Sequence, residues 1–149
     1  MQRKYRVTDQ TLIDLYSQRI LALAADIPYL DRLENPDATC KKRSPLCGSV
    51  IEVDLNVADG KVSAFGQDVK ACALGQAAAS VVGSVIVGRT KAEIETGRDQ
   101  LLAMLKSDGP APSAPFDGFE VLLPAKDYKN RHASIMLCIE ASLDAFQNA

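Results

Sequence analysis

The sequence predicts a single domain that combines several helices with one antiparallel β-hairpin. Two observations predict this mixture. Residues 50–69 form two strand-like runs separated by the turn signal Asp59-Gly60. The segments around them repeat apolar residues at three- and four-residue spacing, which is typical of helices. With 149 residues, the chain has the length of one compact domain, and we expect residues 1–149 to form it.

The first predicted helix is capped by Thr8 and Asp9 and runs to about Asp26. Its apolar residues recur on one face: Leu12, Tyr16, Ile20 and Leu23. Pro28 stops the helix because proline cannot continue the backbone hydrogen bonds. Residues 31–45 are then expected to form a loop.

The hairpin is the clearest local prediction. Its first strand alternates between an apolar face and a polar one, as in a strand buried on one side only. The apolar face is formed by Ile51, Val53, Leu55 and Val57, and the polar face by Glu52, Asp54 and Asn56. Residues 61–69 form the returning strand.

Two helices are expected after the hairpin. Residues 73–87 are rich in alanine, serine, valine and glycine, which predicts a buried helix that packs closely and ends at Gly88. Thr90 and Glu93 form a capping box at the start of an amphipathic helix to about Lys106. The inner stripe of this helix is expected to contain Ile94, Leu101, Leu102 and Leu105.

The last third of the chain is less regular. Residues 107–115 are proline-rich and predict a surface loop, and residues 116–123 form a short apolar segment that is either strand or helix. A final helix is expected from about Asn130 nearly to the end of the chain. Its inner side is expected to carry Ile135, Ile139, Leu143 and Phe146.

The composition argues against two classes of function. The net charge is −2 and the basic residues are spread along the chain, so the basic face of a nucleic-acid-binding protein is missing. No stretch reaches the roughly 18 apolar residues of a membrane span, and no apolar signal segment follows the charged start. We therefore expect a cytoplasmic protein that binds neither nucleic acid nor membrane. In the cytoplasm, its four cysteines are expected to be reduced thiols, metal ligands or sulfur carriers rather than disulfides.

Two of these cysteines flank the hairpin. Cys47 lies in a tight turn before it, and Cys72 lies at the start of the helix after it. Because a hairpin brings its ends together, the two thiols are expected to lie side by side. A helix N-terminus lowers the pKa of a thiol, and Lys70 would help, whereas burial acts in the opposite direction. Taken singly, each cysteine is more often a packing residue.

The only histidine, His132, is expected at the start of the last helix. Such a histidine is usually a surface residue, but thiolates and imidazoles together suit zinc and iron–sulfur sites. Cys138 follows it by six positions, which on a helix means a rotation of about 240° and a rise of about 9 Å. Both cannot bind one ion, so Cys138 is expected to be a core residue. Cys40, in the predicted loop, could swing towards Cys47.

The segments that carry these residues resemble the NifU/IscU-type iron–sulfur cluster assembly scaffold proteins. The resemblance covers nearly the whole chain and is strongest at residues 44–49, the hairpin, 69–77 and 131–134. Two cysteine motifs in this order, with a hairpin between them, are fairly specific. Residues 90–124 are similar to the longer insertion of the SufU-like branch, which IscU proper lacks.

The resemblance implies an α+β fold with helices packed on one face of a small antiparallel sheet, and a site at one exposed edge. It implies a non-enzymatic scaffold that receives sulfur from a cysteine desulfurase, assembles a [2Fe–2S] cluster and passes it to acceptor proteins. In the SufU-like branch it implies a zinc-bound sulfur acceptor that works with the desulfurase. Either role is compatible with a homo-oligomer.

By this resemblance, Cys47 and Cys72 match the first two cysteines of the site, and His132 matches the histidine before the third. We therefore expect these three residues to bind an iron–sulfur cluster or a metal ion, iron or zinc, with Cys72 or Cys47 as the persulfide acceptor. Two positions depart from the family: Ser49 replaces an aspartate, and Ala133 stands in the place of the third cysteine. Three ligands and an open position suit a labile or partner-completed site.

Three hypotheses follow for the function. The first is a scaffold-like protein that binds a cluster or metal ion through Cys47 and Cys72 with the help of His132. The second is a zinc-dependent sulfur acceptor for a cysteine desulfurase, which the missing third cysteine disfavours. The third is a degenerate scaffold paralogue that acts as a binding module.

Overall fold

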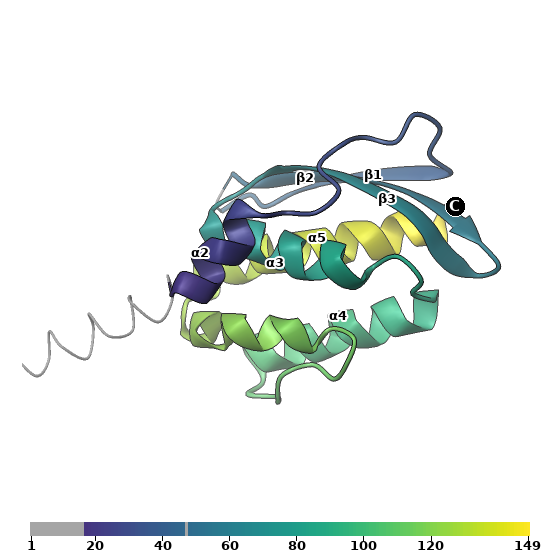
Figure 1. Ribbon diagram of the computed structural model, residues 1–149. Coiled ribbons are helices and arrows are strands. Elements are labelled where there is room, and N and C mark those ends of the chain that lie inside the picture. The colour runs from purple at the N-terminus through teal and green to yellow at the C-terminus, as the bar shows by residue number, and fades with distance from the viewer. Residues whose placement is uncertain (1–16, 47) are drawn as a thin grey trace, which may run out of the picture.

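The protein is described by a computed structural model that covers residues 17–46 and 48–149. Three antiparallel strands form one layer, and helices cover one face of it (Figure 1). This arrangement confirms the predicted α+β fold with a small antiparallel sheet and helices on one side. Among the described residues, no helix is long and apolar enough to cross a membrane.

The sheet has the order β1–β2–β3, with β1 at Ala38–Arg43, β2 at Val50–Ala58 and β3 at Lys61–Lys70. The hairpin of β2 and β3 is the one that the sequence predicts. On the inner face of β2, Ile51, Val53 and Leu55 are completely buried. The apolar half of the predicted alternation therefore forms the contact with the helices.

Strand β1 corrects the sequence prediction, which assigned these residues to a loop. It pairs with β2 from Ala38, opposite Leu55, to Arg43, opposite Val50. The segment carries no apolar alternation of its own, because Lys41 and Lys42 interrupt it. Charged residues are common on edge strands, where they discourage pairing with other chains, so pairing with β2 is what makes this segment a strand.

Within residues 17–46 and 48–149, five helical elements accompany the sheet. They are α2 (Gln18–Ala25), α3 (Ala73–Val85), α4 (Lys91–Lys106), the 3₁₀ helix η1 (Asp117–Asp127) and α5 (Lys129–Gln147). Helix α5 packs against β1 and β2, and α3 packs against both α5 and β3. Helix α4 packs on α5 and lies farther from the sheet (Figure 1). The first helix is described only from residue 17, so the predicted cap at Thr8 and Asp9 lies outside the described residues.

Most of the helix predictions are confirmed in type and extent. Ala77, Ala78 and Ala79 of α3 are completely buried, as the small-residue pattern predicts, and the capping box of Thr90 and Glu93 is formed. The apolar segment after the proline-rich loop is helical, since η1 buries Phe119 and Leu122.

The inner stripe of α4 needs one correction. Leu102 is 36% exposed, whereas Ile94 and Leu101 on the same helix are completely buried. Leu102 directly follows a buried residue, and one step along a helix turns the side chain by about 100°, so it lies nearer the solvent-facing side of the helix.

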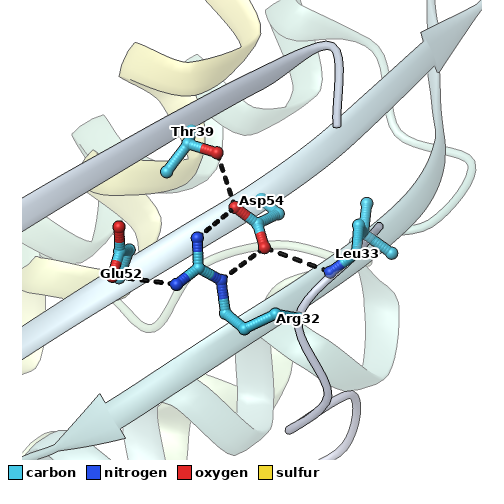
Figure 2. A network of polar contacts seen from close by, with 5 residues as sticks. All are labelled: Arg32, Leu33, Thr39, Glu52 and Asp54. Atoms are coloured by element: carbon cyan, nitrogen blue, oxygen red, sulfur yellow. Dashed lines mark hydrogen bonds and ion pairs between the residues drawn. The ribbon is translucent and has the colours of Figure 1, made fainter. Parts of the chain in front are cut away.

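The outer face of the sheet is partly covered by the segment that follows α2. There Asp54 is completely buried, which corrects the prediction of a solvated polar face. Its carboxylate accepts bonds from Arg32 Nε at 2.5 Å and Nη2 at 2.9 Å, from the Leu33 amide at 3.1 Å and from the Thr39 hydroxyl at 2.5 Å (Figure 2). The carboxylate thus fastens the segment around Arg32 to the strands.

Candidate functional site

Cys72 is the N-cap residue of α3, two residues after β3 ends. The side chain is partly buried. The backbone carbonyl of Cys72 accepts from the Gln76 amide at 2.9 Å, so the first turn of the helix is fully formed. The predicted position of Cys72 at a helix start is therefore confirmed.

Two serines stand beside this cysteine. The Sγ atom of Cys72 lies 3.5 Å from the Oγ atom of Ser134, and that oxygen lies 2.9 Å from the Oγ atom of Ser49. Ser134 comes from α5 and is completely buried, and Ser49 comes from the turn before β2 and is 2% exposed. We call Cys72, Ser134 and Ser49 the cysteine–serine cluster.

Gly75 allows α3 to approach Ser134 this closely. A Cβ atom at position 75 would lie 2.5 Å from the Ser134 Oγ atom and 2.8 Å from the Cβ atom of Ala71. Real Cβ atoms do not approach other heavy atoms at such distances, so any larger residue would have to displace Ser134 or the start of α3. Because Gly75 has no side chain, α3 can lie close enough to Ser134 for the cysteine–serine cluster to form.

The surroundings of Cys72 favour the thiolate. Burial raises the pKa of Cys72, but the Ser134 hydroxyl, the amides of Gly75 and Leu74 and the positive charge of Arg131 lower it, and the net pKa lies below its ordinary value. Arg131 supplies the positive charge, a role that the sequence suggested for Lys70.

The other two described cysteines are held as thiols. Burial and the charge of Asp144 raise the pKa of Cys40, and burial raises the pKa of Cys138 to about 12. Cys138 is completely buried and donates to Gln67 Oε1 at 3.3 Å, so the prediction of a core residue is confirmed. Cys40 is paired opposite Val53 in β1, so it is not the loop residue that the sequence suggested.

His132 is placed by the first turn of α5, and its side chain is only 4% exposed. Its Nε2 atom donates to the carbonyl oxygens of Lys126 at 2.9 Å and Ala125 at 3.2 Å. Carbonyls only accept, so Nε2 is the donor in both bonds and Nδ1 takes no part in them. The expectation of an exposed histidine is wrong, and the ring is anchored to η1.

The structure brings Ser134, and not His132, alongside Cys72. His132 and Ser134 are two positions apart on α5, which corresponds to a rotation of about 200° about the helix axis. Their side chains therefore leave the helix in nearly opposite directions. Cys47 lies outside the described residues, so its predicted place beside Cys72 stays a prediction. Its flanking residues are described: the Ser44 amide donates to the Ser49 carbonyl at 2.8 Å.

Within residues 17–46 and 48–149, no three His, Cys, Asp or Glu side chains gather as they would around a metal ion. The site there consists of one thiol and two hydroxyls. Sequence reasoning missed Ser134, although it lies in the segment 131–134, which carries part of the family resemblance. Spacing along one helix does not reveal which residue faces a neighbouring helix, and only the packing of α3 against α5 identifies it.

A sheet of three antiparallel strands, covered on one face by helices and followed by a cysteine at the next helix start, matches the NifU/IscU-type scaffold fold. Three solved structures show the likeness. The N-terminal part of a nitrogen-fixing NifU-like protein from Brucella abortus is 40% identical over 93% of this chain and 96% of that chain, with a TM-score of 0.91. The chain therefore belongs to the family of NifU-like N-terminal domains, as the resemblance predicts.

The other two structures are more distant. A protein from Fervidobacterium islandicum, assigned as an iron–sulfur cluster assembly scaffold for the SUF system, is 18% identical, with coverages of 90% and 98% and a TM-score of 0.79. A hypothetical protein is 20% identical, with coverages of 86% and 96% and a TM-score of 0.76. At these identities the likeness shows the fold alone. No protein-family model and no curated protein sequence matches the chain.

Proposed function

We propose that this protein is an iron–sulfur cluster assembly scaffold-like protein that carries sulfur or a nascent cluster at Cys72. The observation that carries the proposal is the similarity to the NifU-like protein, at 40% identity over nearly all of both chains. Sulfur and cluster are cargo in this role, because a scaffold takes them up and passes them on. The protein itself needs a reactive thiol and a site that can release the cargo.

The environment of Cys72 supports this role. A partly buried thiol with a lowered pKa is both accessible and nucleophilic, which is the state in which a thiol attacks sulfur or binds a soft metal. The hydroxyl of Ser134 and two backbone amides surround it, and these donors stabilise negative charge on sulfur without covering it. None of them needs to be removed before cargo binds.

The donor set fits a temporary site better than a permanent one. The cysteine–serine cluster contributes one thiol, and Cys47 would contribute a second. His132 would have to use Nδ1, because its Nε2 proton is held by two carbonyls. A [2Fe–2S] cluster or a zinc ion is bound most firmly by four thiolate or imidazole ligands, so the remaining ligands would come from a partner or a second copy of the chain.

The partner at the loading step is expected to be a cysteine desulfurase, and the partner at the delivery step an iron–sulfur acceptor protein. In the loading step, the Cys72 thiolate attacks the outer sulfur of the desulfurase persulfide. A sulfur–sulfur bond forms on Cys72, the bond in the donor breaks, and the donor cysteine leaves as a thiolate. No net oxidation or reduction occurs.

Anaerobic reconstitution tests the proposal. The protein is incubated with ferrous iron and sulfide, and the absorbance and the content of iron and acid-labile sulfide are measured. We expect a chromophore that decays when an acceptor protein is added and that is lost in Cys72→Ser. A folded protein that binds neither iron nor sulfide would exclude the scaffold role and favour the degenerate binding module.

The second candidate, a zinc-dependent sulfur acceptor, shares the reactive Cys72 but differs in the metal. Desulfurase turnover measured with and without this protein separates the two, with zinc added or chelated. Stimulation that depends on zinc supports the sulfur acceptor. Stimulation without zinc supports sulfur loading of the scaffold.

A further inference from the structure

We infer that Ser134 is the specificity-determining residue of this site: it occupies the position of a third metal ligand with a hydroxyl, and thereby keeps Cys72 open to sulfur instead of closed around a metal ion. The part of the inference that concerns sulfur access to Cys72 rests on the proposed function. The part that concerns the position of the metal ligand rests on the geometry alone. It also reassigns the missing third ligand, which the family resemblance places at Ala133.

The separation of Cys72 and Ser134 is the one that a pair of metal ligands needs. Around a tetrahedral ion with bonds of about 2.3 Å to sulfur and about 2.0 Å to oxygen, the two ligand atoms lie about 3.5 Å apart. The separation between Cys72 Sγ and Ser134 Oγ is 3.5 Å. Ala133 is exposed and leaves α5 at about 100° from Ser134, whose hydroxyl is the one beside Cys72.

The chemistry of the hydroxyl explains why no closed metal site follows. A neutral serine hydroxyl is a weak ligand for the soft or borderline ions that thiolates select. The Ser134 hydroxyl is moreover buried and already bonded to Ser49 at 2.9 Å. The serine pair satisfies its own hydrogen bonds, so the cluster needs no ion to be stable.

A matched pair of substitutions tests the assignment. Ser134→Cys restores a thiol where the structure places the third ligand, and Ala133→Cys restores it where the sequence resemblance places it. Each protein is titrated with Co²⁺ under reducing, anaerobic conditions, and the thiolate-to-cobalt absorption is recorded. We expect Ser134→Cys to bind Co²⁺ about tenfold or more tightly than the natural protein, and Ala133→Cys to match the natural protein.

Ser134→Ala covers the case in which the new cysteine disturbs folding. Because the hydroxyl is not a ligand in this account, Ser134→Ala should bind Co²⁺ as weakly as the natural protein. Loss of affinity in Ser134→Ala would show that the hydroxyl does bind the ion and would overturn the inference. A gain of affinity in Ala133→Cys that equals or exceeds the gain in Ser134→Cys would also overturn it.

Competition with zinc tests whether Ser134 leaves Cys72 open to sulfur. The natural protein and the two cysteine variants are preloaded with one equivalent of Zn²⁺ and treated with a cysteine desulfurase and cysteine, and sulfur on the Cys72 peptide is measured by mass spectrometry. We expect zinc to suppress loading in Ser134→Cys but not in the natural protein or Ala133→Cys. Equal suppression in all three would contradict the inference. If the natural protein takes up no sulfur even without zinc, the proposed function fails, while the cobalt result still decides the position of the ligand.

Discussion

Two polar clusters, one on each side of the sheet, differ in how fully the chain satisfies them. Asp54 on the outer side is completely buried, and its carboxylate accepts from Arg32, Leu33 and Thr39 (Figure 2). Cys72 on the inner side is only partly buried, and one side-chain hydroxyl lies beside it. The first cluster has no capacity left for a ligand and serves the fold. The second leaves the sulfur atom of Cys72 available, as the proposed uptake and release of cargo requires.

The largest effect is expected from breaking the outer cluster. Asp54→Ala leaves the Leu33 amide and the Thr39 hydroxyl without their acceptor and removes the anchor of the covering segment. Since Arg32 can turn to solvent, we expect a loss of about 2–4 kcal/mol in the free energy of unfolding, measured by urea denaturation. The control is Glu52→Gln, which removes a more exposed partner of Arg32 and should cost about 0.5 kcal/mol or less. Equal losses would contradict the contrast between the buried and the exposed carboxylate.

The same cluster predicts how stability depends on pH. Burial opposes ionisation of Asp54, but Arg32, Thr39 and the Leu33 amide outweigh it and hold the pKa of the carboxyl below its usual value of 3.8. The unfolded chain therefore takes up this proton more readily than the folded chain. The stabilisation is present above about pH 4 and is lost as the pH falls through the lower folded pKa. We would measure the free energy of unfolding of Asp54→Asn and of the natural protein at several pH values. On the acidic side, this free energy should fall less steeply with decreasing pH in the variant. An equal decrease in both proteins would exclude Asp54 as the cause of the pH dependence.

A smaller loss of stability is expected from the inner cluster. Gly75→Ala forces a Cβ atom against Ser134, at a cost of about 1–3 kcal/mol that the better helix propensity of alanine offsets by about 1 kcal/mol. The control is Ser84→Ala, at an exposed position of the same helix, which should be nearly neutral. The clearer readout is the rate of Cys72 alkylation, which should change in Gly75→Ala and not in Ser84→Ala. An unchanged rate would mean that the contact with Ser134 does not control the thiol.

The smallest effect is a ranking of the cysteines by reactivity. At pH 7, Cys72 should react with iodoacetamide several-fold faster than Cys40, because more of it is thiolate, and Cys138 should react only on unfolding. Peptide mass spectrometry after short labelling measures all three in one sample. Faster labelling of Cys40 would show that exposure, and not the surroundings of Cys72, determines reactivity.

The sequence predicts what depends on local pattern. The apolar face of β2, the Asp59-Gly60 turn and the Thr90–Glu93 capping box are each formed by residues close in the chain, and each is confirmed. Strand β1 was missed because its pairing with β2, rather than its own pattern, makes it a strand.

The site was only partly predictable for the same reason. Cys72 at a helix start is a local feature, whereas Ser134 joins it from 62 residues away. The burial of Asp54 likewise depends on Arg32, which lies 22 residues earlier in the chain. Contacts between distant segments are decided by packing, which single-sequence patterns do not record.

We expect Cys72 to be the exchangeable sulfur acceptor of this chain. The most direct measurement is peptide mass spectrometry after incubation with a cysteine desulfurase and cysteine, with Cys72→Ser and Cys138→Ser as the variant and its control. We expect one added sulfur atom on the Cys72 peptide of the natural protein and of Cys138→Ser. A desulfurase that carries its persulfide while Cys72 remains unmodified would contradict it.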